Sequence, residues 1–340
     1  MAQTKLRSFL QFFILLGIGL LLVWLSLRQV APQKDNIISA FKKADYFWVL
    51  VSMFIAWLSH FFRALRWNDL LLPLGHKTKL LNAVSHVFIG YLTNYGIPRM
   101  GEVSRCTSAA KYDKVPFEIG FGTVITERIV DFILFLVIFF ITLALQFTEL
   151  IGLANELVFD KIRSRMENLY DSPGQMILLT LTVISVVALF LLFRKKISLL
   201  LKGKFGNMLK GMAEGVGSIR KMKRPMRFIL LSLLIWASYF YSLYACFFAI
   251  EGTHQLTQAQ GLTLLLFGTF GVMFSPGGLG AYPLILYGIL VNTYHVSEVA
   301  AFAMPWLAWT AQFILVLFFG ILSFIVLPIY NSKKHVSHPA

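Results

Sequence analysis

The chain has 340 residues, of which 57% are hydrophobic and 14% are charged, against roughly 25% charged residues in an ordinary soluble domain. This composition excludes a soluble globular protein and indicates an all-α polytopic membrane protein. The net charge of +15 comes from 31 lysines and arginines against 16 acids, and in a membrane protein we interpret this excess as a topology signal, not as nucleic-acid binding.

The apolar segments predict about six full transmembrane helices, each long enough to cross the ~30 Å hydrocarbon core of a bilayer. In chain order they are expected near residues 8–27, 46–66, 116–148, 172–193, 228–250 and 305–328. Residues 1–332 are expected to form a single integral membrane domain. A short basic tail, 333–340, follows and is expected to be cytoplasmic.

The first break in this series comes after the second helix. If residues 80–98 crossed the membrane fully, the strongly basic run at 194–227 would be forced outside. We therefore predict that residues 80–112 form a re-entrant helical hairpin, which enters from the cytoplasm and turns near Gly90, Asn94 and Pro98. Non-helical backbone at that depth is allowed only where protein or a polar cavity surrounds it.

The helix that starts near Pro116 carries three charges, Glu127, Arg128 and Asp131, about 17–22 Å along its axis. This depth is near the bilayer centre, where each charge costs roughly 2.5–3.5 kcal/mol on an insertion scale. Glu127 and Asp131 are four residues apart and share a face, so the helix offers Arg128 as a cation with two flanking acids. We expect such charges to face a cavity or one another.

Arg99, Glu102 and Arg105 follow one another at three-residue intervals after the first break. Together with the three charges of the next helix they sum to zero, which leaves two interpretations open. In the first, the six side chains form a closed network of ion pairs. In the second, the arginines bind the phosphate of a lipid headgroup. A guanidinium fork matches phosphate oxygens and can exchange an internal carboxylate for a phosphate.

The run at 194–227 holds eleven basic residues and one acid, and the positive-inside rule places it in the cytoplasm together with both termini. Residues 197–219 within it have apolar side chains at helical spacing and predict an amphipathic helix on the inner leaflet. A helix that binds a cytoplasmic lipid-modifying enzyme is the alternative. Because the spans are apolar and the basic segments face the cytoplasm, the protein is expected in the cell (inner) membrane.

Residues 257–296 carry no formal charge. The run Ser275-Pro-Gly-Gly-Leu-Gly280 interrupts them near the middle. The topology requires this segment to start and finish outside, so we predict a second re-entrant hairpin that enters from the opposite face. Two opposed broken segments are how transporters build a midplane site. The alternative is that proline and glycine merely kink ordinary spans.

The predicted substrate-binding residues are gathered around these breaks: Asn94, Arg99, Arg105, Arg128, Gly277 and Gly278. The predicted counter-ions or proton carriers are Glu102, Glu127 and Asp131. Arg63 and Arg66, at the end of the second helix, are interpreted as snorkelling cations, with membership of the binding site as the alternative. No catalytic residue, metal or cofactor is expected, because the histidines lack metal-ligand spacing and the glycines match no nucleotide-binding motif.

Four motifs together resemble the lysylphosphatidylglycerol synthase transmembrane-domain family, also called flippase-like proteins. They are Arg63-x-x-Arg66-Trp67, the run from Gly90 through Pro98-Arg-x-Gly-Glu-x-x-Arg105, Glu127-Arg-x-x-Asp131 and Pro276-Gly-Gly-Leu-Gly280. The resemblance covers about residues 10–328. The resemblance implies a domain that moves lipids between leaflets. Ala281-Tyr282 stand where many relatives carry a glutamate, and this departure argues against a cargo lipid with a cationic headgroup.

The leading hypothesis is a lipid flippase or scramblase, not an enzyme, that moves a phosphate-bearing or polyprenyl-phosphate-linked lipid between leaflets. One alternative is a membrane-embedded transferase acting on a lipid phosphate, in which Glu102, Glu127 and Asp131 gather Mg²⁺. Another is a non-transporting scaffold for a cytoplasmic enzyme. The expected partners are the membrane and an anionic lipid headgroup.

Overall fold

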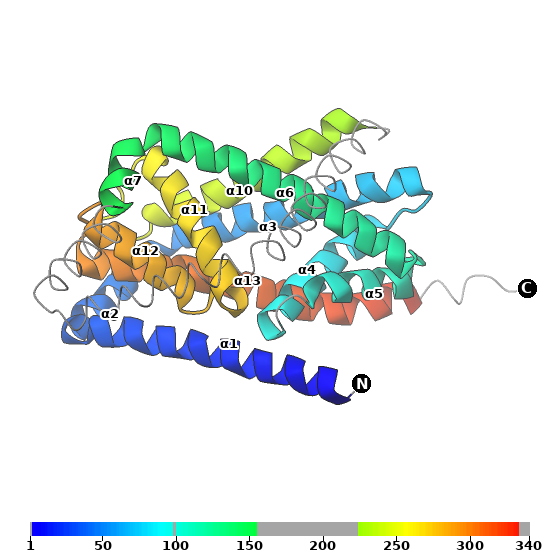
Figure 1. Cartoon of the computed structure of the whole chain (residues 1–340), viewed down its shortest axis with the longest axis horizontal. Coiled ribbons are helices and arrows are strands. Elements are labelled where there is room, and N and C mark those ends of the chain that lie inside the picture. The colour runs from blue at the N-terminus through cyan, green and yellow to red at the C-terminus, as the bar shows by residue number, and fades with distance from the viewer. Residues whose placement is uncertain (1, 98–99, 155–223, 333–340) are drawn as a thin grey trace, which may run out of the picture. The chain divides into compact units, whose positions relative to one another are not determined.

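The computed structural model of the chain describes residues 2–97, 100–154 and 224–332 (Figure 1), and every regular element in these ranges is a helix. The described residues belong to two compact units, one formed by 1–146 with 219–340 and the other by 147–218. Within the second unit the described element is α7 (Phe147–Ala154). The prediction of an all-α protein is confirmed.

Among the described residues, four helices are long and apolar enough to cross a membrane. They are α3 with the short η2 (Tyr46–Leu74), α6 (Phe117–Leu145), α10 (Pro225–Phe247) and α13 (Glu298–Ser332). A fifth candidate span is a bent pair of helical segments, with an angle of 59° between them. It consists of the end of α1 (Ala2–Gln29) and the segment Ala31–Lys43, which contains η1 and α2 (Lys34–Lys43). The chain is a multi-pass membrane protein.

Three sequence predictions fall outside the described residues: the span at 172–193, the amphipathic helix at 197–219 and the tail at 333–340. The last helix was expected to begin near Pro305, but α13 begins at Glu298. Proline removes one backbone hydrogen bond from a helix interior. The turns before it continue regardless, because Ala300, Ala301 and Met304 are buried against neighbouring helices.

The segment predicted as the first hairpin is two helices separated by a break, α4 (Leu80–Gly96) and α5 (Gly101–Asp113). Gly101 lies against the carbonyl of Gly90, so closely that a methyl group there would overlap it. At the other end of the pair, Asp113 accepts a hydrogen bond from Asn82 at 2.9 Å. The two arms therefore start and finish at the same end of the bundle.

The second interrupted segment has the same construction, with α11 (Gln258–Phe274), η4 (Pro276–Gly278) and α12 (Ala281–Asn292). Gly277, Gly278 and Gly280 all have positive φ, which only glycine adopts without strain. They allow the chain to reverse, so that Gly271 of α11 packs directly against the backbone of Tyr282 in α12.

The two hairpins open at opposite ends of the bundle, as Figure 1 shows. Asn82, at the start of the first, exchanges hydrogen bonds with Asn331 at the C-terminal end of α13. The second opens beside the N-terminal end of α13 and the end of α10. The tips of the two hairpins meet, because the ring of Tyr95 covers Gly277. The Gly277 carbonyl also accepts a hydrogen bond from Trp309 Nε1 of α13 at 2.9 Å.

Candidate functional site

Five charged side chains from three helices form one buried network inside the bundle. Arg63 and Arg66 come from α3, Arg105 from α5, and Glu127 and Asp131 from α6; the most exposed of them, Asp131, is 8% exposed. Buried ion pairs are stable only where each charge finds close, well-oriented partners.

Asp131 bridges the two arginines of α3. Its Oδ2 accepts a hydrogen bond from Arg63 Nη1 at 2.9 Å, and its Oδ1 accepts one from Arg66 Nη1 at 2.7 Å. Arg63 and Arg66 are three residues apart and so lie on one face of α3. That spacing lets both guanidinium groups reach a single carboxylate, which fixes α3 to α6.

Glu127, one turn before Asp131, joins α5 to the same network. Arg105 Nη1 donates to its Oε2 at 2.7 Å, and Arg66 Nε lies 3.5 Å from its Oε1. The guanidinium carbon of Arg105 also lies 4.1 Å from the centre of the Trp67 ring, a cation–π contact that is strengthened by desolvation. Trp67 in turn donates to Thr123 at 2.9 Å.

Helix α10 completes the network with two hydroxyl groups. Arg63 Nη2 donates to the Tyr239 hydroxyl at 3.0 Å, and Arg66 Nη1 donates to Ser232 Oγ at 3.1 Å. Tyr91 of α4 lies 3.2 Å from the Tyr239 hydroxyl. Three helices (α3, α6 and α10) and the first hairpin (α4 with α5) are thus tied together through this cluster.

The network carries more cation than anion, because three guanidinium groups face two carboxylates. Five of its guanidinium nitrogens, shared among Arg63, Arg66 and Arg105, have no hydrogen-bond partner among the described residues. A buried N–H without a partner costs roughly 1–3 kcal/mol, and more on a charged group. These N–H groups are donors of the kind that anion oxygens accept from.

A second ion pair, Arg128 with Glu102, lies at the edge of this cluster. Arg128 Nη2 donates to Glu102 Oε1 at 2.6 Å, but the Arg128 side chain is 52% exposed. Glu127 and Asp131, predicted as counter-ions, pair with the buried arginines and not with Arg128. Those acids share the inner face of α6, while Arg128 lies about 100° around the helix from Glu127 and points outward.

Between the pair and the buried network lies a small cavity of about 20 Å³, enough for about one water molecule. Its polar lining contains the side chains of both regions: Arg63, Tyr91, Asn94, Glu102, Arg105 and Arg128. The exposed pair and two of the buried arginines, Arg63 and Arg105, thus line one cavity.

The structure brings some predicted site residues together and separates others. Asn94 lines the cavity, and its Oδ1 accepts the backbone N–H of Gly101 at the start of α5 at 2.7 Å. Gly277 and Gly278 do not line it; the Gly278 N–H donates to Ser275 O at 3.0 Å, within the tip of the second hairpin. Arg99 lies outside the described residues.

The interpretation of Arg63 and Arg66 as snorkelling cations is wrong, since they are only 4% and 0% exposed. The signal that could have identified them is their position inside an apolar helix, three residues apart and followed by Trp67. Neither their burial nor the roles of Ser232 and Tyr239 follow from local sequence.

The proposed magnesium ligands of the alternative transferase are not gathered. Glu102 pairs with Arg128, whereas Glu127 and Asp131 pair with the buried arginines of the network. Across the part of the chain that the structure describes, no three His, Cys, Asp or Glu side chains are placed to hold a metal ion.

Comparison with known proteins identifies a family of membrane-protein regions to which the chain is similar. No match was found among curated proteins or among solved structures. The family described as the lysylphosphatidylglycerol synthase TM region matches residues 12–320, which contain every residue of the buried network and both hairpins. Because the match extends over most of its 340 residues, the chain belongs to the lysylphosphatidylglycerol synthase TM region family.

Proposed function

We propose that the protein moves a phosphate-bearing lipid, or a lipid linked to polyprenyl phosphate, between the two leaflets of the cell (inner) membrane. It acts as a flippase or scramblase and not as an enzyme. The observation that carries the proposal is the buried cluster of three guanidinium groups and two carboxylates, in which Arg63 and Arg105 have unpartnered N–H groups and line the cavity. Phosphate oxygens match that donor set.

In this proposal Arg128 meets the headgroup first. Its exposed side chain releases Glu102 and takes the lipid phosphate in exchange, so that the Arg128 guanidinium has an anionic partner in both states. The phosphate then moves inward toward Arg105 and Arg63. Glu102, Glu127 and Asp131 act as counter-ions during this exchange and carry protons if transport is proton-coupled.

The hairpins supply the conformational change. A cavity of about 20 Å³ is too small for a phosphate group, so α4 and α5 must shift when the headgroup enters. The hairpins dip into the membrane from opposite faces and meet at Tyr95 and Gly277. Separating these tips in one direction or the other would open the site to one leaflet at a time. Both termini are cytoplasmic in this arrangement.

A cytoplasmic lipid-modifying enzyme is the second partner that we propose, with residues 197–219 as its contact. Their apolar side chains at helical spacing, set in a strongly basic run, support this assignment.

The test is a flipping assay with a fluorescent phospholipid in liposomes that contain the purified protein. Arg128→Ala is expected to abolish transport while the protein elutes from gel filtration as the wild type does. Arg28→Ala, which removes an exposed arginine near Trp24 at the end of α1, serves as the matched control and should transport normally. Wild-type rates for Arg128→Ala would refute the proposal, and a covalently altered lipid product would favour the transferase.

A further inference from the structure

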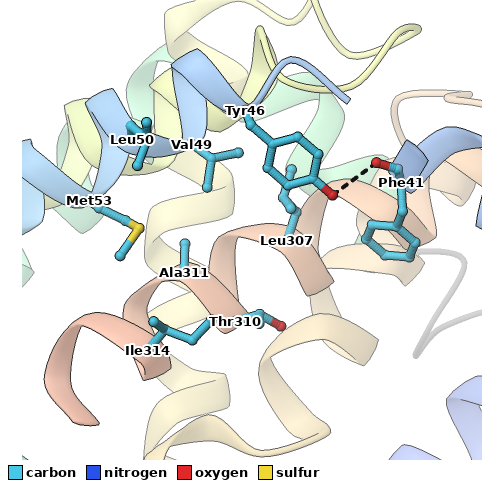
Figure 2. Close-up of a pocket in the computed structure, with 9 residues that line it drawn as sticks. All are labelled: Phe41, Tyr46, Val49, Leu50, Met53, Leu307, Thr310, Ala311 and Ile314. Carbon is cyan, nitrogen blue, oxygen red and sulfur yellow. Dashed lines mark hydrogen bonds between the residues drawn. The ribbon is translucent and has the colours of Figure 1, made fainter. Parts of the chain in front are cut away.

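A large apolar groove lies between α3 and α13, apart from the buried charge network. Its volume is about 430 Å³. Figure 2 shows Val49, Leu50 and Met53 of α3 and Leu307, Ala311 and Ile314 of α13 along its two sides. Met53 precedes Arg63 by ten residues, or about 15 Å of helix, so the groove belongs to a different level of the bundle.

The groove is open to the medium around the helices. Leu50 on one wall is 64% exposed and Ile314 on the other is 49% exposed. Both α3 and α13 are long and apolar enough to span a membrane, so that medium is lipid hydrocarbon. Water would find few partners on these walls, and an empty groove would lose dispersion contacts along its whole length. A hydrocarbon chain satisfies both requirements.

One end of the groove carries a polar rim. Tyr46, the first residue of α3, donates its hydroxyl to the carbonyl of Phe41 in α2 at 3.0 Å, and both residues line the groove (Figure 2). Tyrosine at the start of a span marks the level of the lipid headgroups.

The charges at this rim favour an anion. Lys42 and Lys43, directly after Phe41, are exposed, and the nearest acid along the chain, Asp45, is engaged as the N-cap of α3 through Phe47 N at 3.0 Å. Residues 41–45 thus carry two cations and one anion, a net charge of +1 in the segment beside the rim.

We propose that this groove binds an acyl chain of an anionic phospholipid, with the lipid phosphate held by Lys42 and Lys43. The site is separate from the transport site and does not depend on it. One net positive charge near a membrane surface gives roughly a five-fold preference for an anionic over a zwitterionic headgroup.

The test is photo-crosslinking in nanodiscs of phosphatidylcholine that contain a small fraction of a phosphatidylglycerol with a diazirine in its acyl chain. Adducts are mapped by peptide mass spectrometry. We expect them within 46–53 and 307–314, about five-fold more abundant than with a phosphatidylcholine carrying the same diazirine. Equal labelling by both lipids, no labelling of these segments, or cross-linking of the groove to a second copy of the chain would overturn the proposal.

Two sets of variants separate the tail site from the headgroup site. Ile314→Trp fills the groove and should lower labelling several-fold, whereas Ile321→Trp, at a residue of the same 49% exposure on α13, should leave it unchanged. The double change Lys42→Gln and Lys43→Gln should remove the preference for phosphatidylglycerol while tail labelling persists. Unchanged labelling in Ile314→Trp, or an unchanged preference in the lysine variant, would contradict the assignment.

Discussion

Two sets of ion pairs lie within a few residues of each other on α6, and they differ in burial. Asp131 and Glu127 face inward and are held by arginines that are at most 6% exposed. Arg128 faces outward and pairs with Glu102 while 52% of its side chain is exposed. Adjacent positions on one helix therefore have different roles. The inner set holds helices together, and the outer pair can exchange partners at a small cost in free energy.

The energies follow from this difference in burial. Removing one partner of a buried pair leaves a charge with neither water nor counter-ion, which costs several kcal/mol. An exposed pair contributes about 0–1 kcal/mol. The inner network is consequently a fixed structural scaffold, whereas the outer pair can open without unfolding the protein.

The largest effect is expected from Asp131→Ala. This change leaves both Arg63 and Arg66 without their shared carboxylate, and we expect the free energy of unfolding to fall by about 3–5 kcal/mol. Thermal unfolding in detergent, followed by tryptophan fluorescence, measures it. Glu102→Ala in the outer pair is the matched control and should cost far less; equal losses for the two variants would remove the distinction between the sets.

An intermediate effect is expected from Arg105→Lys, on transport more than on stability. Lysine keeps the charge but loses the planar fork that contacts Glu127 and stacks on Trp67. Loss of one charge-assisted hydrogen bond to a headgroup phosphate should slow flipping about ten-fold. Initial rates in the liposome assay measure it, with Arg227→Lys as the control outside the network. A wild-type rate would show that the fork does not touch the cargo.

The smallest effect is expected on the stability of Arg128→Ala. Because the side chain is half exposed, its loss should change the free energy of unfolding by no more than about 1 kcal/mol. The same thermal assay tests this value. A loss as large as that of Asp131→Ala would mean that the outer pair is structural, and the absence of transport in this variant would then have to be attributed to misfolding.

Much of the fold could be predicted from sequence. The breaks at Gly96–Gly101 and Ser275–Gly280 follow from glycine and proline placed inside apolar runs, and the structure has helix pairs on either side of both. The candidate site was predicted less well. Glu127 and Asp131 were identified because charge is costly inside an apolar helix, but the sequence could not say which arginines reach them, and Arg63 and Arg66 were assigned to the membrane surface.

The sequence by itself determined that this is a helical membrane protein with charges inside one span and two interrupted segments, because hydropathy and the absence of Cβ in glycine act locally along the chain. Only the tertiary structure decided that Asp131 pairs with α3, that Arg128 faces outward, and that Tyr95 meets Gly277. Those choices depend on how the helices rotate and cross. Rotation about a helix axis is set by packing against partners far away in sequence, which no local pattern records.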